Sequence, residues 1–209
     1  MSRWNGKLGQ RGYLLLGAVL VAGLITAGMV SVRTLRSPQL TGTSLGPHDT
    51  APGFQLHDSS GKLYSLSQYR GKVVVLTFMY THCPDVCPLT AELLRQADGL
   101  AGHPANVEYL AVSVDPAGDT AQSVADFIAE HRLNELGDRW HYLVGGPEEL
   151  GPVWTDYYIR NPQPDPPGVP VDHASAIYLI DKHGNRRLLL HVDTPAEVIA
   201  RDERGLGAR

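Results

Sequence analysis

One segment of the chain, KVVVLTFMYT at residues 72–81, would be apolar on both faces if it were extended. β-Branched and aromatic residues of this kind are typical of a central strand that helices cover on both sides. Residues 107–115 and 140–145 have the same character and are also predicted to be strands. Because helical patterns lie between these segments, the sequence predicts an α/β domain in which strands alternate with helices.

The helical patterns have recognisable starts and periods. Four apolar residues recur at helical spacing after the first strand: Leu89, Leu93, Ala97 and Leu100. This spacing predicts a helix with these residues as its apolar stripe. Asp119 or Thr120 can cap a second helix, and residues 147–158 predict a third.

Turn signals complete the order of elements. Residues 59–61 and 182–185 predict two antiparallel hairpins, and a last helix is expected from about residue 194. Between the third helix and the second hairpin, five prolines at residues 161–170 exclude regular structure. The whole is predicted to be a central sheet flanked by helices.

Near the N-terminus, residues 13–32 contain no charged side chain. As a helix these 20 residues would span about 30 Å, the thickness of a bilayer core. We expect an uncleaved transmembrane anchor with its N-terminus in the cytoplasm, because Arg3, Lys7 and Arg11 precede it. A cleaved signal peptide is the alternative, although its apolar region is usually shorter. Either interpretation exports the rest of the chain.

These features divide the chain into five parts. Residues 1–12 form the cytoplasmic N-terminus, 13–32 the anchor, 33–52 a tether rich in Pro, Gly, Ser and Thr, 53–204 the folded domain and 205–209 a tail. The formal net charge is −4, and no cluster of Lys and Arg is present in the exported part. Phosphate binding requires such a cluster, so nucleic acid is excluded as a partner.

The chain has only two cysteines, Cys83 and Cys87, and both lie in the motif THCPDVCP directly after the most apolar strand. Carboxyl ends of strands are where α/β sheets bind ligands. A disulfide closing so short a loop would remove little chain entropy, so reactivity explains the pair better than stability does. Cys87 is expected near the N-terminus of a helix, where the helix dipole favours thiolate and a lowered pKa.

Two thiolates need at least one more ligand to hold a transition metal, and nine histidines are available. His173 is the first candidate, because it precedes a predicted strand that can approach the same sheet edge. His82 adjoins Cys83 and is a weaker candidate, while His183 is expected to be solvated in a hairpin turn.

From about residue 52 to residue 204 the chain resembles the Sco/SenC family. These are thioredoxin-like copper proteins for assembly of the CuA centre of cytochrome c oxidase subunit II. The matching motifs are THCPDVCP around the cysteines, AVSVDPAGDT at residues 111–120 and VDHASAIYLID at residues 171–181. The resemblance extends to an N-terminal anchor. It implies a thioredoxin-like domain with copper ligands Cys83, Cys87 and His173.

Three aspartates also match family positions: Asp85, Asp115 and Asp172. Each is equally expected to support the metal site or to form only a turn, a helix cap or a surface charge. Soft thiolates with one imidazole suit Cu(I), whereas structural zinc usually takes four protein ligands; zinc with a bound water stays an alternative.

Two functions follow from these residues. The first is a membrane-anchored, non-enzymatic metallochaperone that delivers copper to cytochrome c oxidase subunit II, with ligand cysteines that are also redox-active. The second is an enzyme, a thiol–disulfide oxidoreductase that uses Cys83 and Cys87 as its catalytic redox couple; a thiol peroxidase or redox sensor is a weaker third. Thioredoxin-type reductases resemble each other in a two-residue cysteine spacing and in a proline before the facing strand. The three-residue spacing here, and His173 close to where that proline would stand, favour metal binding.

Overall fold

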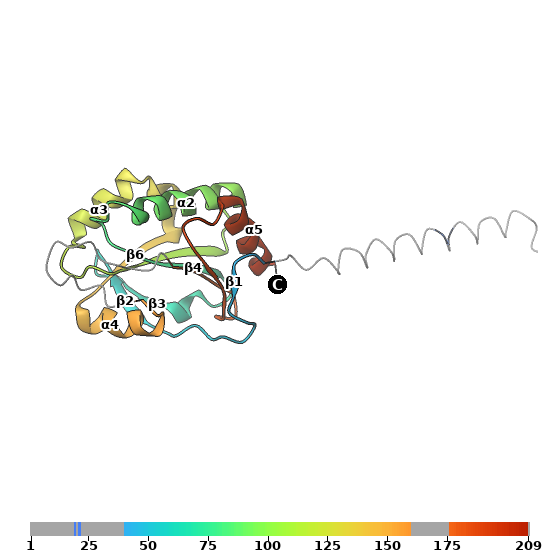
Figure 1. Cartoon of the computed structure of the whole chain (residues 1–209), viewed down its shortest axis with the longest axis horizontal. Coiled ribbons are helices and arrows are strands. Elements are labelled where there is room, and N and C mark those ends of the chain that lie inside the picture. The colour runs from blue at the N-terminus through green and yellow to red at the C-terminus, as the bar shows by residue number, and fades with distance from the viewer. Residues whose placement is uncertain (1–18, 20, 22–39, 160–175, 209) are drawn as a thin grey trace, which may run out of the picture. The chain divides into compact units, whose positions relative to one another are not determined.

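The computed structural model describes residues 19, 21, 40–159 and 176–208. In this part of the chain an eight-stranded mixed sheet has the order β1-β8-β7-β4-β5-β6-β2-β3 (Figure 1). The strands are β1 (Thr43–Ser44), β2 (Gln55–Asp58), β3 (Leu63–Ser65), β4 (Val73–Met79), β5 (Val107–Ser113), β6 (Trp140–Val144), β7 (Ile177–Ile180) and β8 (Arg186–Leu190). The neighbours β4, β5 and β6 are parallel, and all other pairs are antiparallel.

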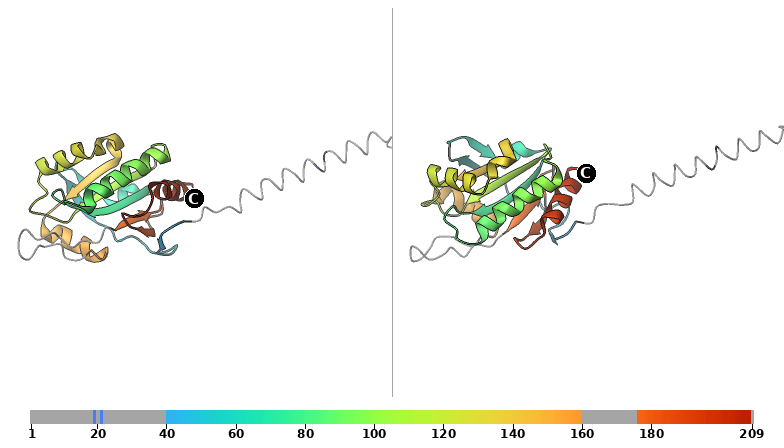
Figure 2. Two further views of the ribbon diagram at one scale, coloured as in Figure 1. Left: turned by 45° about the horizontal axis from the view of Figure 1, so that its top comes forward. Right: turned by 90° about the horizontal axis from the view of Figure 1, so that it is seen from above.

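Helices cover both faces of the sheet. They are α2 (Val86–Ala101), α3 (Ala121–Glu130), α4 (Pro147–Asp156) and α5 (Ala196–Gly207), with 3-10 helices η1 (Leu66–Tyr69) and η2 (Leu133–Arg139). Figure 1 shows α2 and α3 on one face and α4 on the other, and Figure 2 shows α5 beside α2, against which it packs. This is the thioredoxin-like arrangement that the resemblance implies, so the predicted fold class is confirmed for the described residues.

The strand predictions are confirmed within two residues at each end. All seven residues of β4 are buried, as a strand apolar on both faces requires. The hairpin of β7 and β8 and that of β2 and β3 form at the predicted turns. Thr120 caps α3, because its hydroxyl accepts a hydrogen bond from the Ser123 N–H at 3.1 Å.

The helix after the first strand is confirmed as α2, but only half of its predicted apolar stripe faces the core: Ala97 is buried and Leu93 is partly buried. Leu89 and Leu100 are 56% and 52% exposed. The fully buried residues of the helix are Cys87, Thr90, Ala91, Leu94, Ala97 and Asp98. Its polar members have partners inside the protein; the Thr90 hydroxyl, for example, donates to the Val86 carbonyl at 2.8 Å. Counting apolar residues alone therefore misses the polar residues of the buried face and includes two exposed leucines.

The compact unit of the described chain begins at Leu40, ahead of the boundary at residue 53 that the sequence predicts. Thr43 in β1 pairs with Leu189 in β8, and the Asp49 carboxylate binds the Arg186 guanidinium at 2.8 Å. The polar composition of this stretch hid these contacts. Nearly all of the predicted anchor, residues 13–32, lies outside the described residues. Among the helices that the structure does describe, none combines the length and apolarity needed to cross a bilayer.

A buried carboxylate joins α5 to the sheet. The side chain of Glu203 is fully buried, and the Tyr109 hydroxyl donates to it at 3.2 Å. Burial raises the pKa of Glu203 from 4.5 to about 8. Between these two values the folded protein keeps a proton that the unfolded chain releases.

The free energy of unfolding should therefore fall as the pH rises from about 4.5 to about 8, by up to about 1.4 kcal/mol per pH unit from this group. We expect Glu203→Gln to remove this part of the slope and to make the protein more stable than the native chain at pH 8. Urea unfolding at several pH values measures the effect. Glu197→Gln, which changes an exposed carboxylate on the same helix, is the control and should leave the slope unchanged. Parallel curves for the native chain and Glu203→Gln would contradict the prediction.

Candidate metal centre

The two cysteines lie where the central strand leads into the helix on its carboxyl side. β4 ends at Met79, and α2 begins at Val86. Cys83 belongs to the connecting loop and Cys87 to the first turn of α2, with exposures of 7% and 2%. The parallel strand β5 ends at the same edge, at Ser113. The predicted position of the thiols, after the carboxyl end of the central strand, is therefore confirmed.

The first turn of α2 holds the two cysteines against each other. The backbone N–H of Cys87 donates to the Cys83 sulfur at 3.4 Å, and the backbone N–H of Cys83 donates to the Tyr80 carbonyl at 3.4 Å. Both residues are present as cysteines rather than as a disulfide. The two thiols therefore lie next to each other on a short stretch of chain.

The expected lowering of the Cys87 pKa is wrong. The hydrogen bond with Cys83 and burial together raise the pKa of the Cys87 thiol above its ordinary value. These two effects outweigh the favourable position in the first turn of α2. A metal that binds here must displace the thiol proton, because the thiolate is the ligand.

A buried carboxylate behind the cysteine loop is the feature that sequence reasoning missed. Asp119 is 7% exposed. One of its oxygens, Oδ1, accepts hydrogen bonds from the backbone N–H and from the hydroxyl of Thr81, both at 2.8 Å. The other, Oδ2, lies 2.6 Å from the Ser113 hydroxyl and 3.0 Å from the Tyr142 hydroxyl. Burial raises the pKa of Asp119, and these hydrogen bonds oppose that effect.

The sequence suggested Asp119 only as a possible helix cap, and the cap is Thr120. Its position in the motif AVSVDPAGDT was the available signal. Asp115 in the same motif has a turn role, because its carboxylate accepts from the Gly118 N–H at 3.0 Å. Asp85 precedes α2 without a side-chain capping bond, and Asp172 lies outside the described residues.

The third predicted ligand, His173, also lies outside the described residues. Within the described part of the chain, no cluster of three or more His, Cys, Asp and Glu side chains is placed to hold a metal ion. His82 is exposed, with its Nδ1 3.1 Å from the Thr81 hydroxyl, and His183 is exposed in the hairpin turn. Among the described residues the structure therefore brings two thiols together, and sulfur is a donor that suits a soft ion such as Cu(I).

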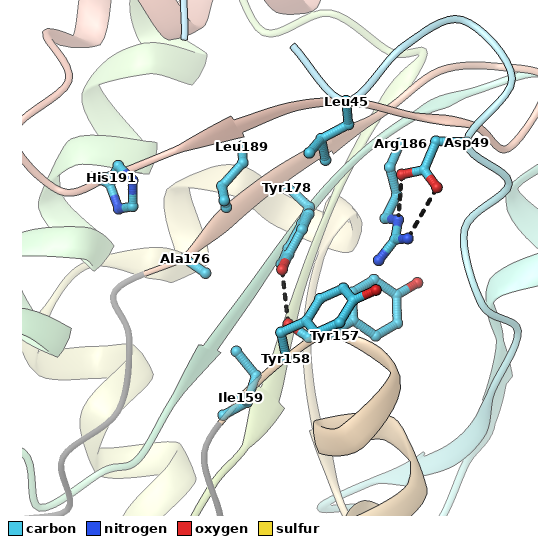
Figure 3. Close-up of a pocket in the computed structure, with 10 residues that line it drawn as sticks. All are labelled: Leu45, Asp49, Tyr157, Tyr158, Ile159, Ala176, Tyr178, Arg186, Leu189 and His191. Atoms are coloured by element: carbon cyan, nitrogen blue, oxygen red, sulfur yellow. Dashed lines mark hydrogen bonds and ion pairs between the residues drawn. The ribbon is translucent and has the colours of Figure 1, made fainter. Parts of the chain in front are cut away.

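A cavity of about 500 Å³ lies elsewhere, beside Ile159 and Ala176. Figure 3 shows Arg186 paired with Asp49 near the tyrosine rings, and Tyr178, whose hydroxyl donates to the Tyr157 carbonyl at 2.7 Å. Neither cysteine lines this cavity. It presents mainly aliphatic groups and ring faces and is distinct from the sulfur pair.

Comparison with known proteins places these features in a family. The family model described as SCO1/SenC matches residues 42–206. The mitochondrial SCO2 homolog of Bos taurus is 32% identical over 200 residues, which cover 86% of this chain and 71% of that protein. The chain spans 43% to 56% of three further mitochondrial SCO relatives from human and Arabidopsis thaliana.

Solved structures agree with these matches. Bradyrhizobium japonicum ScoI with copper bound is 29% identical, with a TM-score of 0.59 over 75% of this chain and 99% of that one. BsSco is described as a member of the Sco family of cytochrome c oxidase assembly proteins with a disulfide switch. It is 25% identical, with a TM-score of 0.66 over 81% of this chain and 99% of that one.

Proposed function

Since this chain belongs to the SCO1/SenC family, we propose that it is a metallochaperone that delivers copper to the CuA site of cytochrome c oxidase subunit II. Its copper ligands are Cys83, Cys87 and His173. The observation that carries the proposal is the buried cysteine pair on the loop between β4 and α2, with the Cys87 N–H 3.4 Å from the Cys83 sulfur. Copper is the cargo of this site, not a fixed structural ion.

The donor set supports copper as that cargo. Thiolate sulfur is a soft ligand that prefers Cu(I), and an imidazole completes a three-coordinate site. Structural zinc sites usually hold four protein ligands, which leaves a three-ligand site better suited to an ion that must be released. The copper-bound ScoI relative, 29% identical, supports the same choice.

Residues 13–32 anchor the protein in the membrane in this proposal, with residues 1–12 in the cytoplasm and the folded domain on the extracytoplasmic side. The uncharged length of this segment and the basic residues before it support the topology. One relative, from Bacillus anthracis, is described as a SCO1/SenC family lipoprotein. We therefore expect the folded domain of this chain to be attached to the membrane through residues 13–32.

A second function, thiol–disulfide oxidoreductase, uses the same two sulfurs as a redox couple. The disulfide switch for which BsSco is described supports it, as does the adjacency of the two cysteines here. The two functions differ in whether they require His173. Loss of the imidazole should abolish copper delivery and leave disulfide reduction intact, whereas loss of either cysteine should abolish both.

Cells that lack this chain should assemble cytochrome c oxidase with little or no CuA, because the subunit II site is not loaded. The native chain should restore CuA, and Cys83→Ser, Cys87→Ser and His173→Ala should not. The CuA signal in electron paramagnetic resonance spectra of isolated membranes measures the result. His183→Ala is the matched control, since His183 is an exposed histidine in the hairpin turn, and it should restore CuA fully. Normal CuA content in the deletion strain would contradict the proposed function.

A further inference from the structure

The carboxylate of Asp119 connects the cysteine loop to two neighbouring strands. On the loop side it binds Thr81 twice, through the backbone N–H and the hydroxyl, each at 2.8 Å. On the sheet side it binds Ser113 at the end of β5 and Tyr142 in β6, at 2.6 and 3.0 Å. All four contacts come from donors, so the carboxylate acts only as an acceptor.

We propose that Asp119 is a positioning residue that fixes the Cys83 sulfur relative to Cys87 by holding Thr81 against β5 and β6. This inference deepens the proposed function and rests on it for the copper part only. Thr81 stands two residues before Cys83, and the Tyr80 carbonyl accepts the Cys83 N–H at 3.4 Å. The start of the loop is therefore held at Thr81 by the carboxylate and at Cys83 by the backbone.

A neighbouring hydroxyl contact holds the strand and not the loop. The Tyr142 hydroxyl also lies 3.3 Å from the Met79 carbonyl, but this contact holds the end of β4 and not Thr81. Removing the carboxylate would take the Asp119 acceptor from the Thr81 backbone N–H and from the buried Ser113 hydroxyl, and a shift of the loop would relieve this loss. Cys83 would move with it.

The spacing of the two sulfurs controls two separate reactions. Copper binding needs both sulfurs on one ion, and disulfide formation needs a narrow range of Cβ–Cβ distances. In the second reaction, oxidised glutathione accepts two electrons. Its S–S bond breaks, the Cys83–Cys87 bond forms, and the two thiol protons pass to the two molecules of reduced glutathione. This equilibrium requires no copper.

The test measures that equilibrium constant and the Cu(I) affinity in the full chain and in four variants. Asp119→Ala should shift the equilibrium toward the dithiol about fivefold or more and should weaken Cu(I) binding by at least as much, since a hydrogen-bonded loop is released. Thr81→Val removes the hydroxyl contacts with Asp119 and His82 but keeps the backbone N–H contact, and it should shift both quantities in the same direction by about twofold to threefold. Asp119→Asn keeps an acceptor for Thr81 and should stay within about threefold of the native chain.

Asp181→Ala is the matched control. Asp181 is also a buried carboxylate that holds a turn, because it accepts the N–H groups of His183 and Asn185 at 3.0 and 2.9 Å. Asp181→Ala should destabilise the fold but leave the glutathione equilibrium constant and the Cu(I) affinity at native values. The inference is overturned if Asp119→Ala keeps the native equilibrium constant, or if Asp181→Ala shifts it equally.

If Asp119→Ala does not fold, Thr81→Val decides, and a native equilibrium constant in that variant overturns the inference. If the native chain binds no copper, the proposed function fails, but the glutathione equilibrium still decides the role of Asp119.

Discussion

Replacing Cys83 or Cys87 by Ser should lower the affinity of the reduced chain for Cu(I) by about 100-fold or more, because a neutral hydroxyl is a hard, poor ligand for a soft ion. His173→Ala should cost less, about 10- to 100-fold, since two thiolates stay available for linear coordination. Anaerobic competition with a chromophoric Cu(I) chelator measures each affinity.

Two exposed histidines provide the controls. His82 lies next to Cys83 in sequence and bonds Thr81, and His183 lies in the hairpin turn. Alanine at either position should leave the affinity close to that of the native chain. Equal binding by all of these variants would mean that the copper site lies elsewhere. If His82→Ala lost affinity for Cu(I) and His173→Ala did not, His82 would be the third ligand in place of His173.

Asp98→Ala should remove a large part of the folding stability, about 3–5 kcal/mol of the free energy of unfolding. Asp98 is 1% exposed on the inner face of α2, and its carboxylate binds the Arg139 guanidinium at two positions, one of them at 2.9 Å. His103 binds the same carboxylate at 2.6 Å. Without Asp98, the largely buried Arg139 charge would have lost its counterion.

Urea unfolding followed by circular dichroism measures this loss. Glu92→Ala on the same helix is the control, because the Glu92–Arg95 pair is partly exposed and should contribute less than about 1 kcal/mol. Similar losses in the two variants would contradict the assignment of Asp98 as a buried charge that holds α2 to η2.

The sequence predicts the sheet of this protein well, because its central strands consist mostly of apolar residues. Every residue of β4 is buried, and the hairpin turns carry strong local signals. The face of α2 was predicted less well, since its inner side includes Thr90 and Asp98. Such residues are recognised as core only when their partners are known, and the partner of Asp98, Arg139, is 41 residues away.

The site shows the same division between local and distant causes. Cys83 and Cys87 were found from their place after a buried strand, and the structure brings them together. Asp119 was missed because its role depends on Thr81, 38 residues away, and on Tyr142 in another strand. The predicted direction of the Cys87 pKa shift is wrong because the hydrogen bond with Cys83 and burial, which raise this pKa, arise only in the folded structure. The assignment of His173 as a ligand stays a prediction.

X-ray absorption at the copper edge of the Cu(I)-loaded chain tests the copper site most directly, with His173→Ala measured beside it. The native chain should show two sulfur scatterers and one imidazole nitrogen in the first shell, and the variant should lose the imidazole and keep both sulfurs. A first shell that contains no imidazole, or that is identical in the two proteins, would contradict a copper site built from Cys83, Cys87 and His173.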